Sequence, residues 1–143
     1  IQNDILIPNR YIQEWKTKNK QRNINLVFKK NKIMGLDIQP EEKEVERINF
    51  LELEGYSDPL TSFLNIFLNN LDSKTIDGRR VYLLSPNKNN DYTKVLIKNY
   101  INIWADHSKN DLEYLEIFQN SEEELPYKIN IKFKGSVFVV KKL

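Results

Sequence analysis

Residues 57–73 read Ser-Asp-Pro-Leu-Thr-Ser-Phe-Leu-Asn-Ile-Phe-Leu-Asn-Asn-Leu-Asp-Ser, and this segment carries the clearest helix signal in the chain. Asp58 can accept hydrogen bonds from the free N–H groups of a first helical turn, and proline is tolerated at the first helical position. Large apolar residues then recur at three- and four-residue spacing, which places them on one side of a helix: Leu60, Phe63, Leu64, Phe67 and Leu71. The segment predicts an amphipathic helix that begins at Pro59, ends near Asp72 and buries this stripe.

Strand patterns lie on both sides of the predicted helix. Side chains alternate between two faces in successive segments, as half-buried strands require: 11–16, 23–28 and 34–38 before the helix, and 80–84, 95–104, 112–118, 129–133 and 137–140 after it. Asp77-Gly78 predicts a tight turn, 86–91 a loop, and Asn99 a bulge in the longest strand. This order predicts a mainly β (α+β) fold, in which one curved antiparallel sheet packs around one long helix.

The length and composition limit the classes of function. The chain has 143 residues, 40% of them hydrophobic, which suits a single domain over residues 1–143. It has no cysteine, so a disulfide framework, a thiol nucleophile and thiolate metal sites are excluded. The formal net charge is only +2, and no stretch approaches the roughly 18 apolar residues of a membrane-spanning helix. We therefore expect a folded domain without a transmembrane segment.

No group of residues has the pattern of a catalytic or metal site. His107 is the only histidine, whereas a zinc or copper site draws on several histidine or cysteine ligands. A calcium loop starting at Asp106 would need Gly and Glu at its sixth and twelfth positions, which are Asp111 and Ile117. The carboxylate pair Glu52 and Glu54 is expected by chance among 20 acidic residues. We predict that the protein is not an enzyme and uses no cofactor or metal.

Basic side chains alternate along one early segment, beside Tyr11 and Trp15: Lys16, Lys18, Lys20 and Arg22. Basic residues interleaved with aromatic ones can bind single-stranded nucleic acid. The same pattern describes the solvent face of an exposed hairpin, where lysines block edge-to-edge pairing of strands. Because the chain as a whole is not strongly basic, we prefer the hairpin and predict no nucleic-acid partner.

Several segments together carry a family resemblance. Residues 56–64, Tyr-Ser-Asp-Pro-Leu-Thr-Ser-Phe-Leu, resemble a helix start with the pattern D-P-L-S-A-L-Y-Y-L. Residues 6–11, Leu-Ile-Pro-Asn-Arg-Tyr, match a strand entry L-x-P-x-R-Y, residues 118–120 match an aromatic-polar turn, and residues 125–137 resemble a terminal strand pair. These patterns are typical of a family of exported bacterial proteins that is catalogued only as a domain of unknown function.

The resemblance implies a half-open β barrel wrapped around the helix, similar to the periplasmic lipoprotein carriers LolA and LolB, which bind acyl chains in the concavity. It implies a periplasmic location, with a signal peptide already removed, and it offers no catalytic residues. The family's first N-terminal strands, with their glycine-bearing hairpin, have no counterpart before Ile1. The resemblance therefore implies a barrel that is unsealed on one side.

We accordingly expect a non-enzymatic envelope protein that binds an apolar or amphiphilic ligand, such as a lipid or lipoprotein acyl chain, between helix and sheet. The predicted pocket walls come from the helix stripe and from the strands: Leu26, Phe28, Phe63, Phe67, Ile101, Ile103, Ile131 and Phe133. The alternative is a protein-interaction module with a filled core, which binds an envelope protein partner through an exposed sheet edge.

Overall fold

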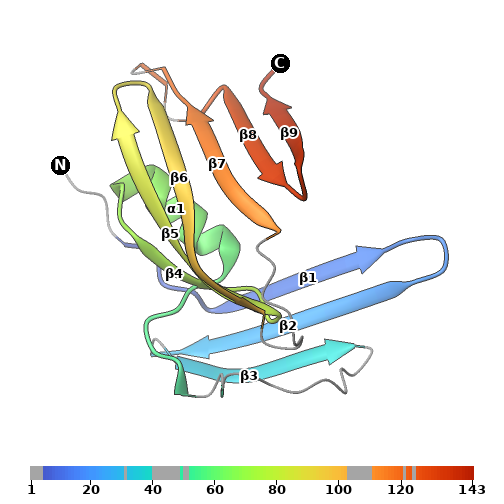
Figure 1. Cartoon of the computed structure of the whole chain (residues 1–143). Helices are drawn as coiled ribbons and strands as arrows, with labels where there is room; N and C mark the ends of the chain where they lie inside the picture. Colours follow the sequence, from blue (N-terminus) through green and yellow to red (C-terminus); the bar gives the residue numbers. More distant parts are fainter. Residues whose placement is uncertain are drawn as a thin grey trace.

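The computed structural model describes residues 5–30, 32–39, 49, 52–102, 111–120, 122–123 and 125–143. These residues form two antiparallel sheets and one helix (Figure 1). The smaller sheet contains β1 (Arg10–Lys16), β2 (Gln21–Lys29) and β3 (Lys32–Gln39), and the helix α1 (Pro59–Asn69) follows it in sequence. The larger sheet contains β4 (Ser73–Ile76), β5 (Arg80–Asn89), β6 (Tyr92–Asn102), β7 (Leu112–Phe118), β8 (Lys128–Phe133) and β9 (Ser136–Lys141), in sequence order.

The predicted fold class is confirmed, because the described chain is mainly antiparallel β with a single helix. The strands divide into two sheets, whereas the sequence predicted one continuous half-barrel. Among the described strands β4 pairs only with β5 and β9 only with β8, so the larger sheet does not close into a barrel. In Figure 1 the strands of the smaller sheet run below the larger sheet and in a clearly different direction.

The longest hairpin, β5–β6, confirms one local prediction and corrects another. Asn99 has a φ of 54°, and the register shifts opposite it between Val81 and Leu83, which is the predicted bulge. The predicted loop over 86–91 is wrong, because β5 continues to Asn89 and Pro86 pairs with Val95. Ser73, the first residue of β4, pairs with Leu84, so beyond Leu84 no described strand pairs with β5 on that side. A proline fits at position 86 because its missing N–H is not required for pairing there.

The helix begins at Pro59, directly after its predicted N-cap residue Asp58. The Asp58 carboxylate accepts hydrogen bonds of 3.1 Å from the backbone N–H groups of Leu60 and Thr61, and one of 2.6 Å from the Thr61 hydroxyl. The helix ends earlier than predicted, because Asn70 adopts the left-handed conformation with a φ of 53°. The next residues are then free to form β4, a strand that the sequence analysis did not predict.

The predicted orientation of the helix about its own axis is wrong. Its buried residues are Ser62, Asn65 and Ile66, whereas Leu60 is 66% exposed and Leu64 is 42% exposed. The small Ser62 permits a close approach to β4, where the Thr75 hydroxyl donates a 2.8 Å hydrogen bond to it. Asn65 exchanges two hydrogen bonds with the backbone of Leu6, of 2.7 and 2.9 Å. These buried polar partners hold the polar side of the helix inward.

Two apolar cores hold the described elements together. One lies between the smaller sheet and the start of β5, and it includes Ile24, Leu26, Phe28, Ile76 and Val81. The other lies between α1 and the strands β5–β7: Ile66, Tyr82, Leu84, Val95, Ile97 and Ile117. Ile76 and Val81, which flank the turn between β4 and β5, belong to the first core. Tyr82 and Leu84, further along β5, belong to the second core. The turn therefore lies where the two cores meet.

Candidate functional site

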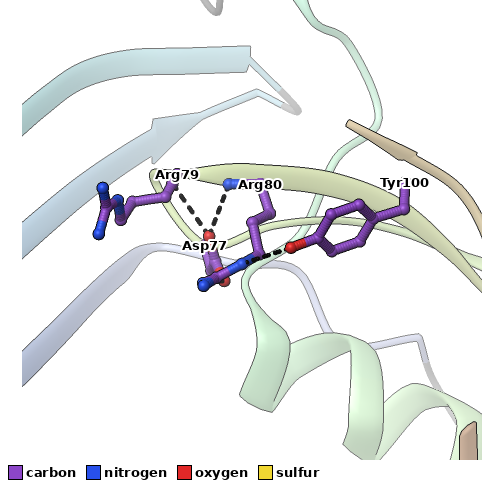
Figure 2. Close-up of polar contacts among 4 residues, drawn as sticks. All are labelled: Asp77, Arg79, Arg80 and Tyr100. Atoms are coloured by element: carbon purple, nitrogen blue, oxygen red, sulfur yellow. Dashed lines mark hydrogen bonds and ion pairs between the residues drawn. The ribbon is translucent and has the colours of Figure 1, made fainter. Parts of the chain in front are cut away.

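The β4–β5 turn carries a buried carboxylate, that of Asp77, within a cluster of polar contacts (Figure 2). The carboxylate of Asp77 accepts hydrogen bonds from the backbone N–H groups of Arg79 and Arg80, at 2.9 and 2.8 Å. The Arg80 guanidinium lies 3.3 Å from the second carboxylate oxygen and donates a 2.7 Å bond to the Tyr100 hydroxyl. Burial raises the pKa of Asp77, and the charge and hydrogen bonds of Arg80 oppose that rise.

This polar cluster has the geometry of a structural tie. The Asp77 carboxylate is occupied by donors of its own turn, and Tyr100 stacks on Tyr82 with ring centroids 6.3 Å apart. Gly78, in the same turn, lies against Ile24 of β2, where an added Cβ would be 2.6 Å from the Ile24 Cγ2 atom. The cluster therefore fixes the turn between the two sheets.

A different feature marks the larger sheet, namely an apolar face that continues past the helix. Residues that pair directly across antiparallel strands point to the same face. The register aligns Ile117 with Ile129 and Val140, and it aligns Leu115 with Ile131 and Phe138. Ile117 belongs to the core that α1 covers, so all six side chains lie on the helix side of the sheet. We call these six residues the inner face of β7–β9.

The helix covers only part of this face. Figure 1 shows α1 behind β4–β6, with β8 and β9 extending beyond it. Burial falls across the sheet accordingly: Ile117 is buried, Ile129 and Ile131 are half-buried, and Phe138 and Val140 are 53% and 55% exposed. The inner face of β7–β9 is therefore apolar and open to solvent at its β9 end.

The opposite face of the same strands carries polar interactions. The Tyr92 hydroxyl donates a 2.6 Å hydrogen bond to Glu116, which raises the pKa of Tyr92 to about 12. The Lys94 ammonium lies 4.8 Å from the ring centroid of Tyr114, and the Lys128 ammonium lies 5.1 Å from that of Phe118. The larger sheet therefore has one face with charged and polar pairs and one apolar face that is partly uncovered.

The helix adds a second exposed apolar stripe, formed by Leu60, Leu64 and Leu68, and exposed Leu71 follows just after the helix end. The three leucines of the stripe lie opposite the buried side of α1, since they are spaced by four from one another along the helix. Phe63 lies between the two sides and packs against the core that includes Ile117. Contiguous exposed apolar surface of this kind is typical of binding sites for apolar ligands or partners.

The predicted pocket residues do not lie around one space. Leu26 and Phe28 are buried in the core of the smaller sheet, and Ile101 packs against that core. Phe63 packs on the other core, and Phe67, one turn further along α1, is half-buried. Ile131 belongs to the inner face of β7–β9, and Phe133 continues it toward the β8–β9 turn. Ile103 lies outside the described residues.

Phe138 and Val140, the most exposed residues of the inner face, were not among the site residues predicted from the sequence. Residues 137–140 form an uninterrupted apolar run, and such a run does not indicate which strand face points toward the helix. Pairing with the alternating residues of β8 supplies that information.

The described hollows lie elsewhere. One of about 260 Å³ is lined by residues 5–8 together with Gly55, Ser57, Asn65, and residues 71–73. Another, of about 180 Å³, includes Tyr82 and the predicted residue Ile101. A third, of about 460 Å³, lies at the tip of the β1–β2 hairpin beside Trp15, Lys20 and Arg22. The alternating lysines of the sequence analysis belong to this projecting hairpin, and all of them are exposed.

The structure offers little support for the residues considered as catalytic or metal-binding candidates in the sequence. His107 lies outside the described residues, while Glu52 and Glu54 are exposed and Glu54 pairs with Lys32 at 3.1 Å. Within the described ranges, no three His, Cys, Asp or Glu side chains gather as a metal site would require. No helix in this part of the chain is long and apolar enough to cross a membrane. Comparison with protein-family models, curated proteins and solved structures finds no match to the chain.

Proposed function

We propose that the protein is a non-enzymatic binding protein of the bacterial cell envelope that holds an anionic amphiphile, such as a fatty acid or a lysophospholipid. The acyl chain would lie on the inner face of β7–β9, beside the helix. The observation that carries this proposal is the apolar face that continues past α1 onto exposed Phe138 and Val140. The envelope location rests on the resemblance of the sequence to exported proteins.

The energetics favour a ligand on this surface. Covering apolar surface contributes roughly 25 cal/mol per Å², so each 100 Å² that an acyl chain covers would contribute about 2.5 kcal/mol. An acyl chain needs no hydrogen-bond partner, and the inner face of β7–β9 offers only apolar side chains. The described hollow of about 260 Å³ includes the polar residues Asn65, Asp72 and Ser73 in its lining and is a less suitable place for such a chain.

A lysine, Lys134, lies at the end of the inner face, where it could bind the charged head group of an amphiphile. Lys134 lies in the β8–β9 turn, and its ammonium is 5.4 Å from the ring centroid of Phe133. Phe133 continues the inner face of β7–β9 at this end, since it follows Ile131 by two residues in β8. A carboxylate or phosphate bound near Lys134 would therefore place its acyl chain along the inner face.

The test compares two substitutions on neighbouring residues of β9. Fatty acids and lysophospholipids should raise the melting temperature of the protein, because a ligand of the folded state stabilises it by mass action. Phe138→Asp should abolish this rise. Val139→Asp should retain it, because Val139 is equally exposed but lies on the opposite face. The proposal fails if no lipid shifts the melting temperature, or if both variants keep the full shift.

A further inference from the structure

The outer edge of β9 has unused backbone hydrogen-bonding groups in a regular order. Lys134 and Gly135 form a two-residue turn, both with positive φ, between the paired residues Phe133 and Ser136. At the other end of the hairpin, the Lys142 N–H donates a 2.9 Å bond to the carbonyl of Tyr127. Even-numbered residues of β9 therefore bond to β8, because bonded positions in antiparallel pairs recur every second residue.

The odd-numbered residues of the strand, Val137, Val139 and Lys141, consequently point their N–H and C=O groups away from β8. No other described strand pairs with this edge. The opposite edge of the sheet differs, because β4 has only four residues and Ser57 exchanges two backbone bonds with it, through Lys74 and Ile76. The β4 edge is therefore covered in part, whereas no described residue covers the backbone of the β9 edge.

The β9 edge also lacks the features that usually prevent strand addition. Such features include proline, bulges and charged side chains in the middle of the strand. The β8–β9 register runs without a shift from Ser136 to Lys141, and the strand contains no proline. Its middle residues are the exposed, β-branched or aromatic run 137–140. The edge has the backbone and side-chain properties of a template for another strand.

The β8–β9 hairpin and its flanking residues are basic, and one of their lysines, Lys142, pairs with Glu123 at 3.5 Å. Residues 125–143 contain five lysines and no aspartate or glutamate: Lys128, Lys132, Lys134, Lys141 and Lys142. The register places Lys128, Lys132 and Lys141 on the same face as Val137 and Val139, away from the helix. The other face of the hairpin carries Phe138 and Val140. A strand added beside β9 would thus meet Val137, Val139 and Lys141 on one face, with Lys132 one strand further away on β8, and apolar Phe138 and Val140 on the other face.

We infer that the outer edge of β9 binds an extended peptide segment of a partner protein, with acidic side chains on one face and apolar side chains on the other. The segment would pair with Val137, Val139 and Lys141 through its backbone, and charge complementarity would select its sequence. A second copy of this chain fits less well, because antiparallel pairing of two β9 strands would set these five lysines near the same five. This inference does not require the proposed lipid ligand, and the two ligands would share Phe138, Val140 and Lys134.

The experiment uses the full chain and two capped peptides long enough to span β9, one alternating Glu and Val and the other alternating Lys and Val. Fluorescence anisotropy should show binding of the Glu-Val peptide and no binding of the Lys-Val peptide. Val139→Pro should weaken the binding about tenfold, because it removes an outward N–H donor. Val139→Thr keeps that donor and should bind as the unmodified protein does. Circular dichroism would confirm that both variants are folded.

Amide hydrogen exchange supplies the second readout. The peptide should slow exchange at Val137, Val139 and Lys141, and it should change Phe138 and Val140 much less, because those amides already bond to β8. The double substitution Lys132→Glu with Lys141→Glu should reverse the preference between the two peptides. This pattern of alternate residues would not arise from a ligand that covers one face of the sheet.

Several outcomes would overturn the inference. They are equal binding of the two peptides, unchanged exchange at the odd-numbered amides, and full binding by Val139→Pro. Concentration-dependent dimers that protect the same amides without peptide would assign the edge to a second copy. Binding to phosphatidylglycerol vesicles in place of the peptide would assign the lysines to a lipid surface. The fatty-acid response of Val139→Pro separates this test from that of the proposed function, since that variant keeps the inner face intact.

Discussion

The orientation of α1 about its axis can be tested by comparing Ile66→Ala with Leu64→Ala. Ile66 is 2% exposed and packs in the core between the helix and the larger sheet, whereas Leu64 points to solvent. Both substitutions remove three carbon atoms from the same helix, two residues apart. They differ in what surrounds the deleted atoms, which makes Leu64→Ala the matched control.

The expected magnitudes follow from burial. Three buried carbon atoms contribute about 2.4 kcal/mol at roughly 0.8 kcal/mol each, and the cavity left behind raises the cost to about 3 kcal/mol. The higher helix propensity of alanine returns a few tenths of a kcal/mol. Ile66→Ala should therefore lower the free energy of unfolding by about 2–4 kcal/mol. Leu64→Ala should change it by less than about 1 kcal/mol.

Urea unfolding followed by circular dichroism and by tryptophan fluorescence measures both values. Coincident transitions from the two probes would show that unfolding is two-state, so that the free energies can be compared. Equal losses in the two variants, or a larger loss for Leu64→Ala, would contradict the observed orientation. Either result would favour the helix face that the leucine spacing predicts from the sequence.

Three further predictions concern local features of the fold. Asp58→Ala should lower the free energy of unfolding by about 1 kcal/mol in urea titrations, because the helix loses its N-cap. Gly78→Ala should cost about 2–4 kcal/mol in the same assay, since it adds a Cβ clash with β2 to the strain of positive φ. Gly135→Ala, with positive φ but open space around it, should cost only about 1–2 kcal/mol, and equal costs would contradict the close contact between the sheets. Burial raises the pKa of Tyr11 to about 12 and also raises that of Tyr82, so the folded state holds these protons more tightly than the unfolded state. Stability should therefore fall as the pH rises from about 10 toward 12, and Tyr11→Phe should reduce that fall in urea titrations across the range.

Features that depend on neighbours in the chain could be predicted from the sequence. The Asp58 cap, the Asp77-Gly78 turn and the bulge at Asn99 all appear where the sequence places them. Each arises from the conformational preference or hydrogen bonding of a few adjacent residues. Period-two alternation likewise located most strands, because successive side chains of a strand must point to opposite faces.

The buried side of α1 could not be predicted from its apolar stripe, because the helix buries the side that carries Ser62 and Asn65 together with Ile66. Leu60 and Leu64 lie on one side and Ile66 on the other, so the spacing of leucines is compatible with more than one orientation. The hydrogen bond between Ser62 and Thr75 and the bonds between Asn65 and Leu6 favour the observed orientation. These partners are distant in sequence, and only the tertiary structure brings them together.

The candidate binding surface also depends on contacts between distant residues. The sequence indicated that Ile131 and Phe133 lie in a strand, and it contained the apolar run of residues 137–140. Whether those side chains are core or surface depends on how far the helix reaches across the sheet and on which strand ends it. In the folded chain α1 covers β5–β7 and stops short of β9, whose outer edge no described strand pairs. The sequence by itself thus determined the strands and their turns, whereas the tertiary structure decided which apolar side chains remain exposed, because burial depends on what packs against a residue from elsewhere in the chain.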